Sequence, residues 1–165
     1  KASAAGQTNK AYLPLRQCSN VVRNLNMPIM FDDSKSIEQL ENDFWPITVK
    51  SPTVLTEKCY HYRRLPVKRL NTEQTRLLIG QNIGLEFLIP KALKILYFNI
   101  LAKGDFYPGD LLMAVMNCEE EYWNSHLDLK TELIELITQK REEIESQNNS
   151  NTFRQLLKTL DSFVK

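Results

Sequence analysis

Histidine, glycine and cysteine are scarce in this chain of 165 residues. Its two histidines, His61 and His126, are far apart, and neither has a second ligand residue at the spacing of a zinc site, so no metal centre is expected. The three cysteines, Cys18, Cys59 and Cys118, form neither a CxxC pair nor an even-numbered disulfide framework. This usage is typical of a reducing compartment in which thiols are buried or idle.

The signatures of common enzymes are missing as well. The chain contains no GxSxG, no HExxH and no phosphate-binding loop. Gly80 and Gly84 do not follow a predicted strand, as the glycines of a dinucleotide-binding loop would. We therefore expect a protein that has no catalytic activity and holds no cofactor.

Long apolar runs are also lacking. The most apolar segment, Leu85 to Phe98, is interrupted by Glu86, Lys91 and Lys94 and falls short of the roughly 20 residues that cross a bilayer. Residues 1–6 lack the apolar core of a secretory signal peptide. A cytoplasmic location is therefore expected.

Helical patterning is what the sequence does contain. Asn71 or Thr72 can cap a helix that ends at Gly80 and Gly84. Since glycine has no Cβ, one of these two can reverse the chain in the left-handed conformation while the other allows close approach of a neighbouring backbone. The pattern predicts a helix, a tight turn and a second helix.

That second helix is the predicted centre of the core. Residues 85–98 are almost wholly apolar, and Pro90 within them either starts a new helix or kinks a single one. The following GDFYPGD, residues 104–110, predicts a turn, with Pro108 at the first position of the next helix and Asp110 near its positive end.

The flanking segments also read as helices. Asp33 or Ser34 is expected to cap a helix near the N-terminus, and Leu129 to Ile144 predict one long amphipathic helix. The chain is thus predicted to be an all-α, single-domain bundle of about seven to eight helices with little or no strand. Residues 1–26 are predicted to be an N-terminal arm or a leader, and residues 27–165 the helical domain.

Two motifs in the central region are specific. They are IGQNIGL at 79–85 and YPGDLL at 107–112, flanked by SIEQLENDFW and LTEKCYHYRRLPVKRL. In these residues the chain resembles the immunity proteins of bacterial contact-dependent growth inhibition systems, over about Ser36 to Trp123. The resemblance implies a cytoplasmic antitoxin that binds and blocks the toxic C-terminal domain of a cognate effector, with a 1:1 complex expected.

Charge is distributed unevenly along the chain although the net charge is only +1. Residues 105–165 hold twelve acidic and six basic residues. If the toxin is a nuclease, as many effectors of this family are, its substrate groove is basic, and acidic immunity residues would mimic phosphates. The candidate toxin-binding residues are acidic side chains and two aromatic anchors: Asp105, Tyr107, Asp110, Glu119, Glu120, Glu121, Trp123 and Glu132. Simpler explanations stand beside this one, namely a solvated acidic helix, a structural turn at YPGDLL, carboxylates that favour a helix start, and core positions for Tyr122 and Trp123.

A basic cluster supports the rival hypothesis. Tyr60, His61 and Tyr62 are interleaved with its members, which are Lys58, Arg63, Arg64, Lys68, Arg69 and Arg76. Such a patch could neutralise phosphates and stack bases, so the alternative function is RNA or phosphate binding. The bland interpretation is a solvated helix end whose arginines complement the negative helix C-terminus.

Overall fold

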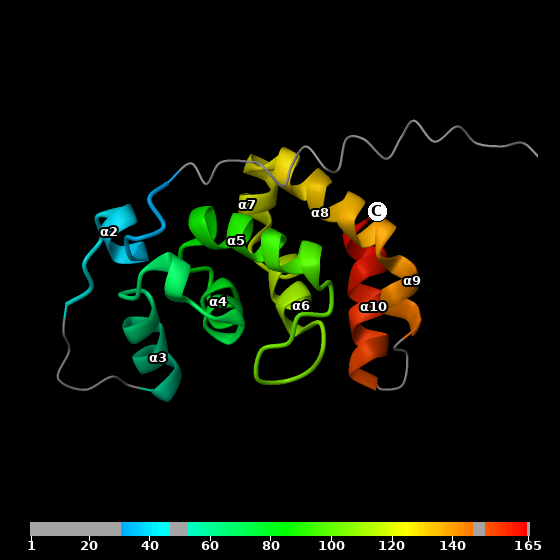
Figure 1. The fold of residues 1–165 in the computed structure, drawn as a ribbon, viewed down its shortest axis with the longest axis horizontal. Coiled ribbons are helices and arrows are strands. Elements are labelled where there is room, and N and C mark those ends of the chain that lie inside the picture. Colours follow the sequence, from blue (N-terminus) through cyan, green and yellow to red (C-terminus); the bar gives the residue numbers. More distant parts are fainter. Residues whose placement is uncertain (1–30, 47–52, 147–150, 165) are drawn as a thin grey trace, which may run out of the picture. The chain divides into compact units, whose positions relative to one another are not determined.

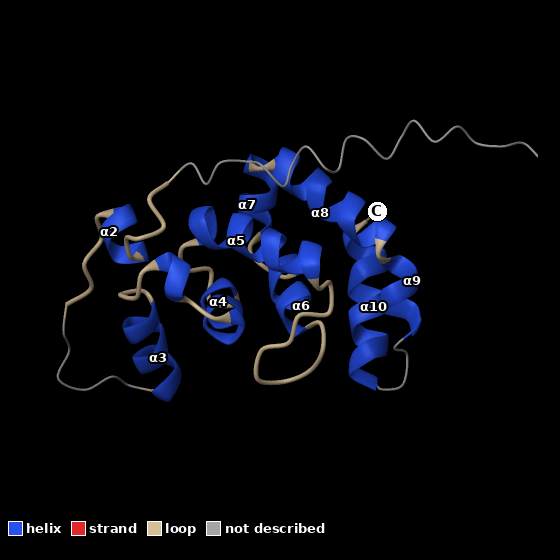
Figure 2. Ribbon diagram, viewed as in Figure 1, coloured by secondary structure: helices blue, strands red, loops and turns tan. Residues whose placement is uncertain are grey.

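The computed structural model describes residues 31–46, 53–146 and 151–164, and all of them belong to one compact unit. Within these ranges the chain forms nine α-helices, one short 3-10 helix and no strand (Figures 1 and 2). The α-helices are α2 Ile37–Glu41, α3 Val54–Tyr62, α4 Thr72–Ile79, α5 Leu85–Phe98, α6 Asp110–Met116, α7 Glu120–Ser125, α8 Leu127–Gln139, α9 Arg141–Ser146 and α10 Asn151–Phe163. The predicted all-α class is confirmed, while the predicted arm at residues 1–26 and Cys18 lie outside the described residues.

Helices α4, α5 and α6 pack against one another and form the centre of the core. Leu88, Ile89 and Leu96 of α5 have no exposed surface, and each such burial is worth roughly 1.5–3 kcal/mol. Pro90 lies inside α5, which settles the open alternative in favour of one continuous helix. The prediction of a central buried helix at residues 85–98 is confirmed.

In the turn between α4 and α5, Gly84 combines the left-handed conformation and the close contact that were predicted for two different glycines. Asn71 caps α4, since its Oδ1 accepts the Gln74 backbone N–H at 2.9 Å while the Gln74 side chain accepts the N–H of Asn71. Gly80 ends α4, and Gly84 adopts φ +66° at the start of α5. A Cβ on Gly84 would lie 2.8 Å from Cδ1 of Ile37, so glycine also allows α2 to pack closely there.

Two predicted helix starts are wrong. Ser36, rather than Asp33 or Ser34, caps α2, because Ser36 and Gln39 form a reciprocal capping box that starts the helix later. Pro108 does not occupy the first helical position, because Gly109, at φ +88°, follows it as the cap of α6.

The predicted long helix from Leu129 to Ile144 is broken at Lys140 into α8 and α9. Beyond the break Ile144 is fully buried, and Arg141 reaches Asp161 of α10 at 2.8 Å. The bend thus lets α9 lie beside α10 (Figure 1), which a straight continuation of α8 would prevent.

Helix α10 closes the core against α6. Phe153, Leu156 and Leu160 are buried, and Leu156 lies so close to Gly109 that a Cβ there would come within 2.9 Å of its Cδ2. Every helix within the described ranges is too short or too polar to cross a lipid bilayer.

Candidate functional site

Seven of the eight predicted toxin-binding residues fall into two groups at opposite ends of α6, and Glu132 lies apart from them on α8. Asp105, Tyr107 and Asp110 lie in or just after the loop that enters the helix, whereas Glu119 to Glu121 and Trp123 follow its C-terminus. Seven residues of α-helix rise roughly 10 Å, so the structure brings together the members of each group but not the two groups.

Asp110 is an internal partner of the loop before α6 rather than a surface residue. Its side chain is 3% exposed, and its carboxylate accepts the backbone N–H of Gly104 at 2.6 Å and that of Phe106 at 3.1 Å. Arg76 of α4 approaches the same carboxylate at 3.9 Å. This burial removes Asp110 from the accessible surface, and we do not keep it as a toxin-contacting residue.

The same loop is held from α4 by an ion pair. Arg76 donates from Nε and Nη2 to the two carboxylate oxygens of Glu73, both at 2.6 Å. Glu73 Oε2 also accepts the backbone N–H of Asp105 at 2.9 Å. The hydrogen bond from Arg76 is the main cause that lowers the pKa of Glu73, and burial opposes it.

This lowered pKa predicts an acid-dependent loss of stability. A carboxyl group whose pKa is below its ordinary value of 4.5 in the folded protein stabilises the fold above that value, and this is lost as the pH falls through the folded-state pKa. Glu73→Gln should lower the free energy of unfolding by about 2 kcal/mol near neutral pH and by less at about pH 3. Urea unfolding of both proteins across this range measures the difference, and a difference that does not change with pH would contradict it.

The rest of this first group lies at the surface or partly beneath it. Asp105 is exposed, and its carboxylate forms no ion pair within the described part of the chain. Tyr107 is half-buried, and burial is the main cause that raises the pKa of its hydroxyl. Between them Phe106, which the sequence analysis did not select, is 65% exposed and its ring lies 4.6 Å from the Arg76 guanidinium.

The second group supplies accessible carboxylates and a buried aromatic pair. Glu119 to Glu121 are exposed at the start of α7, as predicted for a helix start. Tyr122 and Trp123 are buried with their rings edge to face, which confirms the core interpretation. Trp123 is therefore not available as an anchor at the surface.

Glu132, on α8, is a carboxylate with acidic neighbours. It is half-buried, with Asp128 four residues before it and Glu135 three residues after it on the same helical face. Burial, then Asp128 and Glu135, raise the pKa of Glu132. Within the described ranges neither these three nor Glu119 to Glu121 belong to an ion pair, so this acidic segment, residues 119–135, is not neutralised internally.

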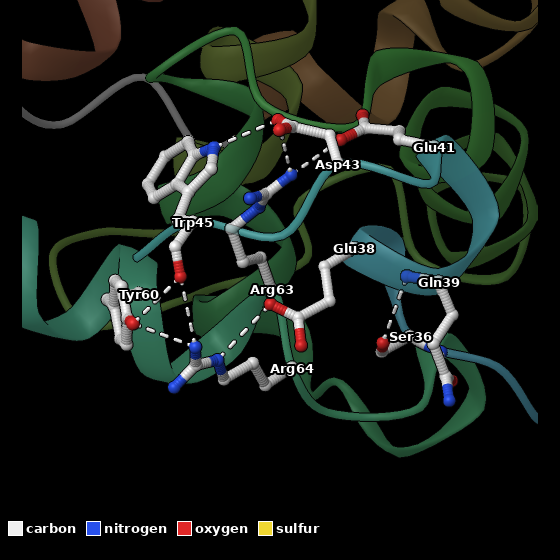
Figure 3. A network of polar contacts seen from close by, with 9 residues as sticks. All are labelled: Ser36, Glu38, Gln39, Glu41, Asp43, Trp45, Tyr60, Arg63 and Arg64. Atoms are coloured by element: carbon white, nitrogen blue, oxygen red, sulfur yellow. Dashed lines mark hydrogen bonds and ion pairs between the residues drawn. The ribbon is translucent and has the colours of Figure 1, made fainter. Parts of the chain in front are cut away.

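The arginines of the basic cluster are largely used inside the protein (Figure 3). Arg63, at the end of α3, is 1% exposed, and its Nη2 donates to Glu41 Oε2 at 2.8 Å and to Asp43 Oδ2 at 3.2 Å. Its guanidinium carbon lies 4.0 Å from the ring centre of Trp45. Arg63 therefore holds the end of α2 and the segment after it against α3, and its buried guanidinium is not available to a nucleic acid.

Arg64 completes this network. Its guanidinium donates to Glu38 at 3.2 Å, to the Tyr60 hydroxyl at 2.7 Å and to the Trp45 carbonyl at 3.3 Å. The Tyr60 hydroxyl also donates to that carbonyl at 2.9 Å. In Figure 3 the Arg63 guanidinium lies beside the Trp45 ring and the Arg64 guanidinium near the Trp45 carbonyl, so the two neighbouring arginines hold the same residue.

The hypothesis of an RNA-binding patch loses much of its basis with these pairings. Arg63, Arg64 and Arg76 are each engaged by internal carboxylates, which leaves Lys58, Lys68 and Arg69 exposed. The carboxylates responsible were not singled out from the sequence. Glu73, three residues before Arg76, was the one with a local signal, because acid and base at that spacing share a helical face.

Neither thiol that the structure describes has the environment of a reactive cysteine. Cys59 and Cys118 are free and buried, and burial is the main cause that raises the pKa of Cys118 to about 12. Among the described residues, no three His, Cys, Asp or Glu side chains gather as ligands of a metal ion. The predicted toxin-binding residues that remain exposed or half-buried lie in the loop before α6 and in the acidic segment 119–135.

Comparison with known proteins identifies a family for the chain. The family model described as CDI immunity proteins, where CDI stands for contact-dependent growth inhibition, matches residues 39–133. The match includes the loop before α6, Arg63, Arg64, Arg76 and the acidic segment as far as residue 133, and it stops within α8. No curated protein and no solved structure matches the chain. Since the family model covers more than half of its residues, the chain belongs to the family of CDI immunity proteins.

Proposed function

We propose that this protein protects its host by binding the toxic C-terminal domain of a cognate contact-dependent growth inhibition effector and covering the toxin's active site. The complex is 1:1, it forms in the cytoplasm, and the immunity protein itself catalyses nothing. Family membership supports the binding of a toxin. The internal use of Arg63, Arg64 and Arg76 supports protein binding over the alternative of RNA binding.

We further propose that the toxin is a nuclease. The observation that carries this is the acidic segment 119–135, in which Glu119, Glu120, Glu121 and Glu132 remain without a basic partner in the described ranges. A groove that binds nucleic acid is lined by basic side chains, and an opposing acidic surface accelerates association with it. Exposed Asp105 and half-buried Tyr107 stay as proposed contacts at the other end of α6.

The test is a titration against the toxin domain encoded by the reading frame directly upstream of this chain's gene. Its nuclease activity on RNA and DNA should fall linearly and vanish at one equivalent of immunity protein. Absence of a complex would refute the proposed function, and a complex that retains full nuclease activity would refute active-site blocking. Salt-sensitive binding of the immunity protein alone to the RNA would instead favour the alternative.

A charge variant with a matched control tests the acidic segment. Replacing Glu120 and Glu121 by glutamine should slow association with the toxin and weaken its salt dependence. In the control, Glu143→Gln with Glu145→Gln, the lost carboxylates are already paired with Lys140 and Arg141 of the same chain. An equal fall in both association rates would show that only net charge matters.

Glu132→Gln should separate stability from binding. It removes like-charge repulsion with Asp128 and Glu135, which at this helical spacing is worth about 0.5 kcal/mol in total. Because the folded-state pKa of Glu132 is raised, its ionisation costs stability as the pH rises, so the variant should be the more stable protein at neutral pH. Denaturant unfolding measures the stability of the variant, and titration measures its affinity for the toxin. A variant that is less stable than the unaltered protein, or that binds the toxin more tightly, contradicts the prediction.

A further inference from the structure

The loop before α6 presents one aromatic side chain from a closed turn. Lys103 and Pro108 form an isolated bridge, and the N–H of Gly109 donates to the Leu101 carbonyl at 3.1 Å, so the base of the loop is closed. Phe106 lies at the tip and is 65% exposed. A single exposed ring is common on protein surfaces, so what distinguishes Phe106 is the way its turn is held.

The tip is held by carboxylates from two helices. Three successive backbone N–H groups, those of Gly104, Asp105 and Phe106, donate to Asp110, Glu73 and Asp110 respectively. Arg76 forms ion pairs with the carboxylates of Glu73 and Asp110, and its guanidinium lies 4.6 Å from the centre of the Phe106 ring. These hydrogen bonds fix the backbone that carries Phe106 before a partner binds.

A partner gains from such preorganisation. Binding energy at interfaces is concentrated in a few anchors that fill a pocket on the partner, and an anchor held in place beforehand avoids the entropy cost of ordering. Next to the ring, the carboxylate of Asp105 is exposed; it attracts Arg76 electrostatically but forms no ion pair with it or with another described residue. A pocket that receives Phe106 would therefore carry a cationic group at its rim.

We propose that Phe106 is the central anchor with which this protein binds the toxin domain. The Phe106 ring enters an apolar pocket of the toxin, and Asp105 faces a lysine or arginine at the rim of that pocket. This inference rests on the proposed function and names the surface that carries it out. A second copy of this chain fits less well. A two-fold contact through Phe106 would bring Asp105 against its own counterpart, and like charges in contact disfavour that pairing.

The experiment compares Phe106→Ala with Phe98→Ala against the upstream-encoded toxin domain. Phe98 ends α5, is 78% exposed and lies against Tyr97, so the control removes a similar exposed ring that no hydrogen-bonded turn presents. Loss of a hot-spot anchor should raise Kd by about 30-fold or more, mostly through faster dissociation, whereas Phe98→Ala should change it by less than about 3-fold. Unfolding curves of both variants verify that they fold.

The outcomes separate this inference from the proposed function. If the unaltered protein does not bind the toxin, the proposed function itself fails. If it binds but Phe106→Ala binds equally well, or if Phe98→Ala is equally weakened, the anchor is refuted while toxin binding stands. Finding the free protein as a dimer that Phe106→Ala dissociates would assign the ring to self-association and also overturn the inference.

Discussion

Replacing Asp110 by alanine should lower the free energy of unfolding by about 3 kcal/mol, a large share of the stability of a typical domain. The 3% exposed carboxylate is the acceptor for two backbone N–H groups, those of Gly104 and Phe106. Without it both donors lose their partner, and the penalty for an unsatisfied donor that stays away from water exceeds the value of an average hydrogen bond. Denaturant unfolding at neutral pH measures the loss.

Asp105→Ala is the matched control for this prediction. It removes a carboxylate from the same loop, but one that is exposed and forms no ion pair among the described residues, so the change should stay within about 0.5 kcal/mol. Asp110→Asn should fall between Asp110→Ala and the unaltered protein, because its amide oxygen still accepts one N–H while its NH₂ group faces the other donor. If Asp110→Ala proved as stable as Asp105→Ala, the loop would not depend on this carboxylate.

Asn71 and Asp110 differ in how well the sequence alone predicts their structural roles. Local chemistry within a few residues predicts the cap as Asn71 or Thr72 and the left-handed residue as Gly80 or Gly84, and the structure has Asn71 and Gly84 in these places. The burial of Asp110 was not, because the sequence shows only an acid at a helix start. Its depth is set by α4 and α10, which pack against α6 from distant parts of the chain.

The basic cluster failed as a predictor for the same physical reason. Arg63 pairs with acids 20 and 22 residues earlier in the chain, and no periodicity connects positions so far apart. A run of arginines and tyrosines looks the same in sequence whether the guanidinium groups point to water or to carboxylates of another helix. Only the packing of the segment after α2 onto α3 distinguishes these cases.

The second large effect concerns the same packing. Removing the carboxylates that pair with Arg63 should cost more stability than removing Arg63 itself. Glu41→Gln combined with Asp43→Asn should cost about 3 kcal/mol or more, because it leaves the Arg63 guanidinium buried and uncompensated. Arg63→Met should cost clearly less. The two carboxylates it leaves behind are 31% and 60% exposed, so water can solvate them.

Three features of the site support this order. Arg63 Nε and Nη1 find no acceptor among the described residues, so methionine removes two unsatisfied donors along with the charge. Methionine has a similar length, and its sulfur can replace the guanidinium over the Trp45 ring. Denaturant unfolding of both variants at equal ionic strength compares the two costs. A larger loss of stability for Arg63→Met than for the double carboxylate variant would contradict this order. It would mean that the arginine stabilises the fold through its own hydrogen bonds and that groups other than Glu41 and Asp43 solvate its buried charge.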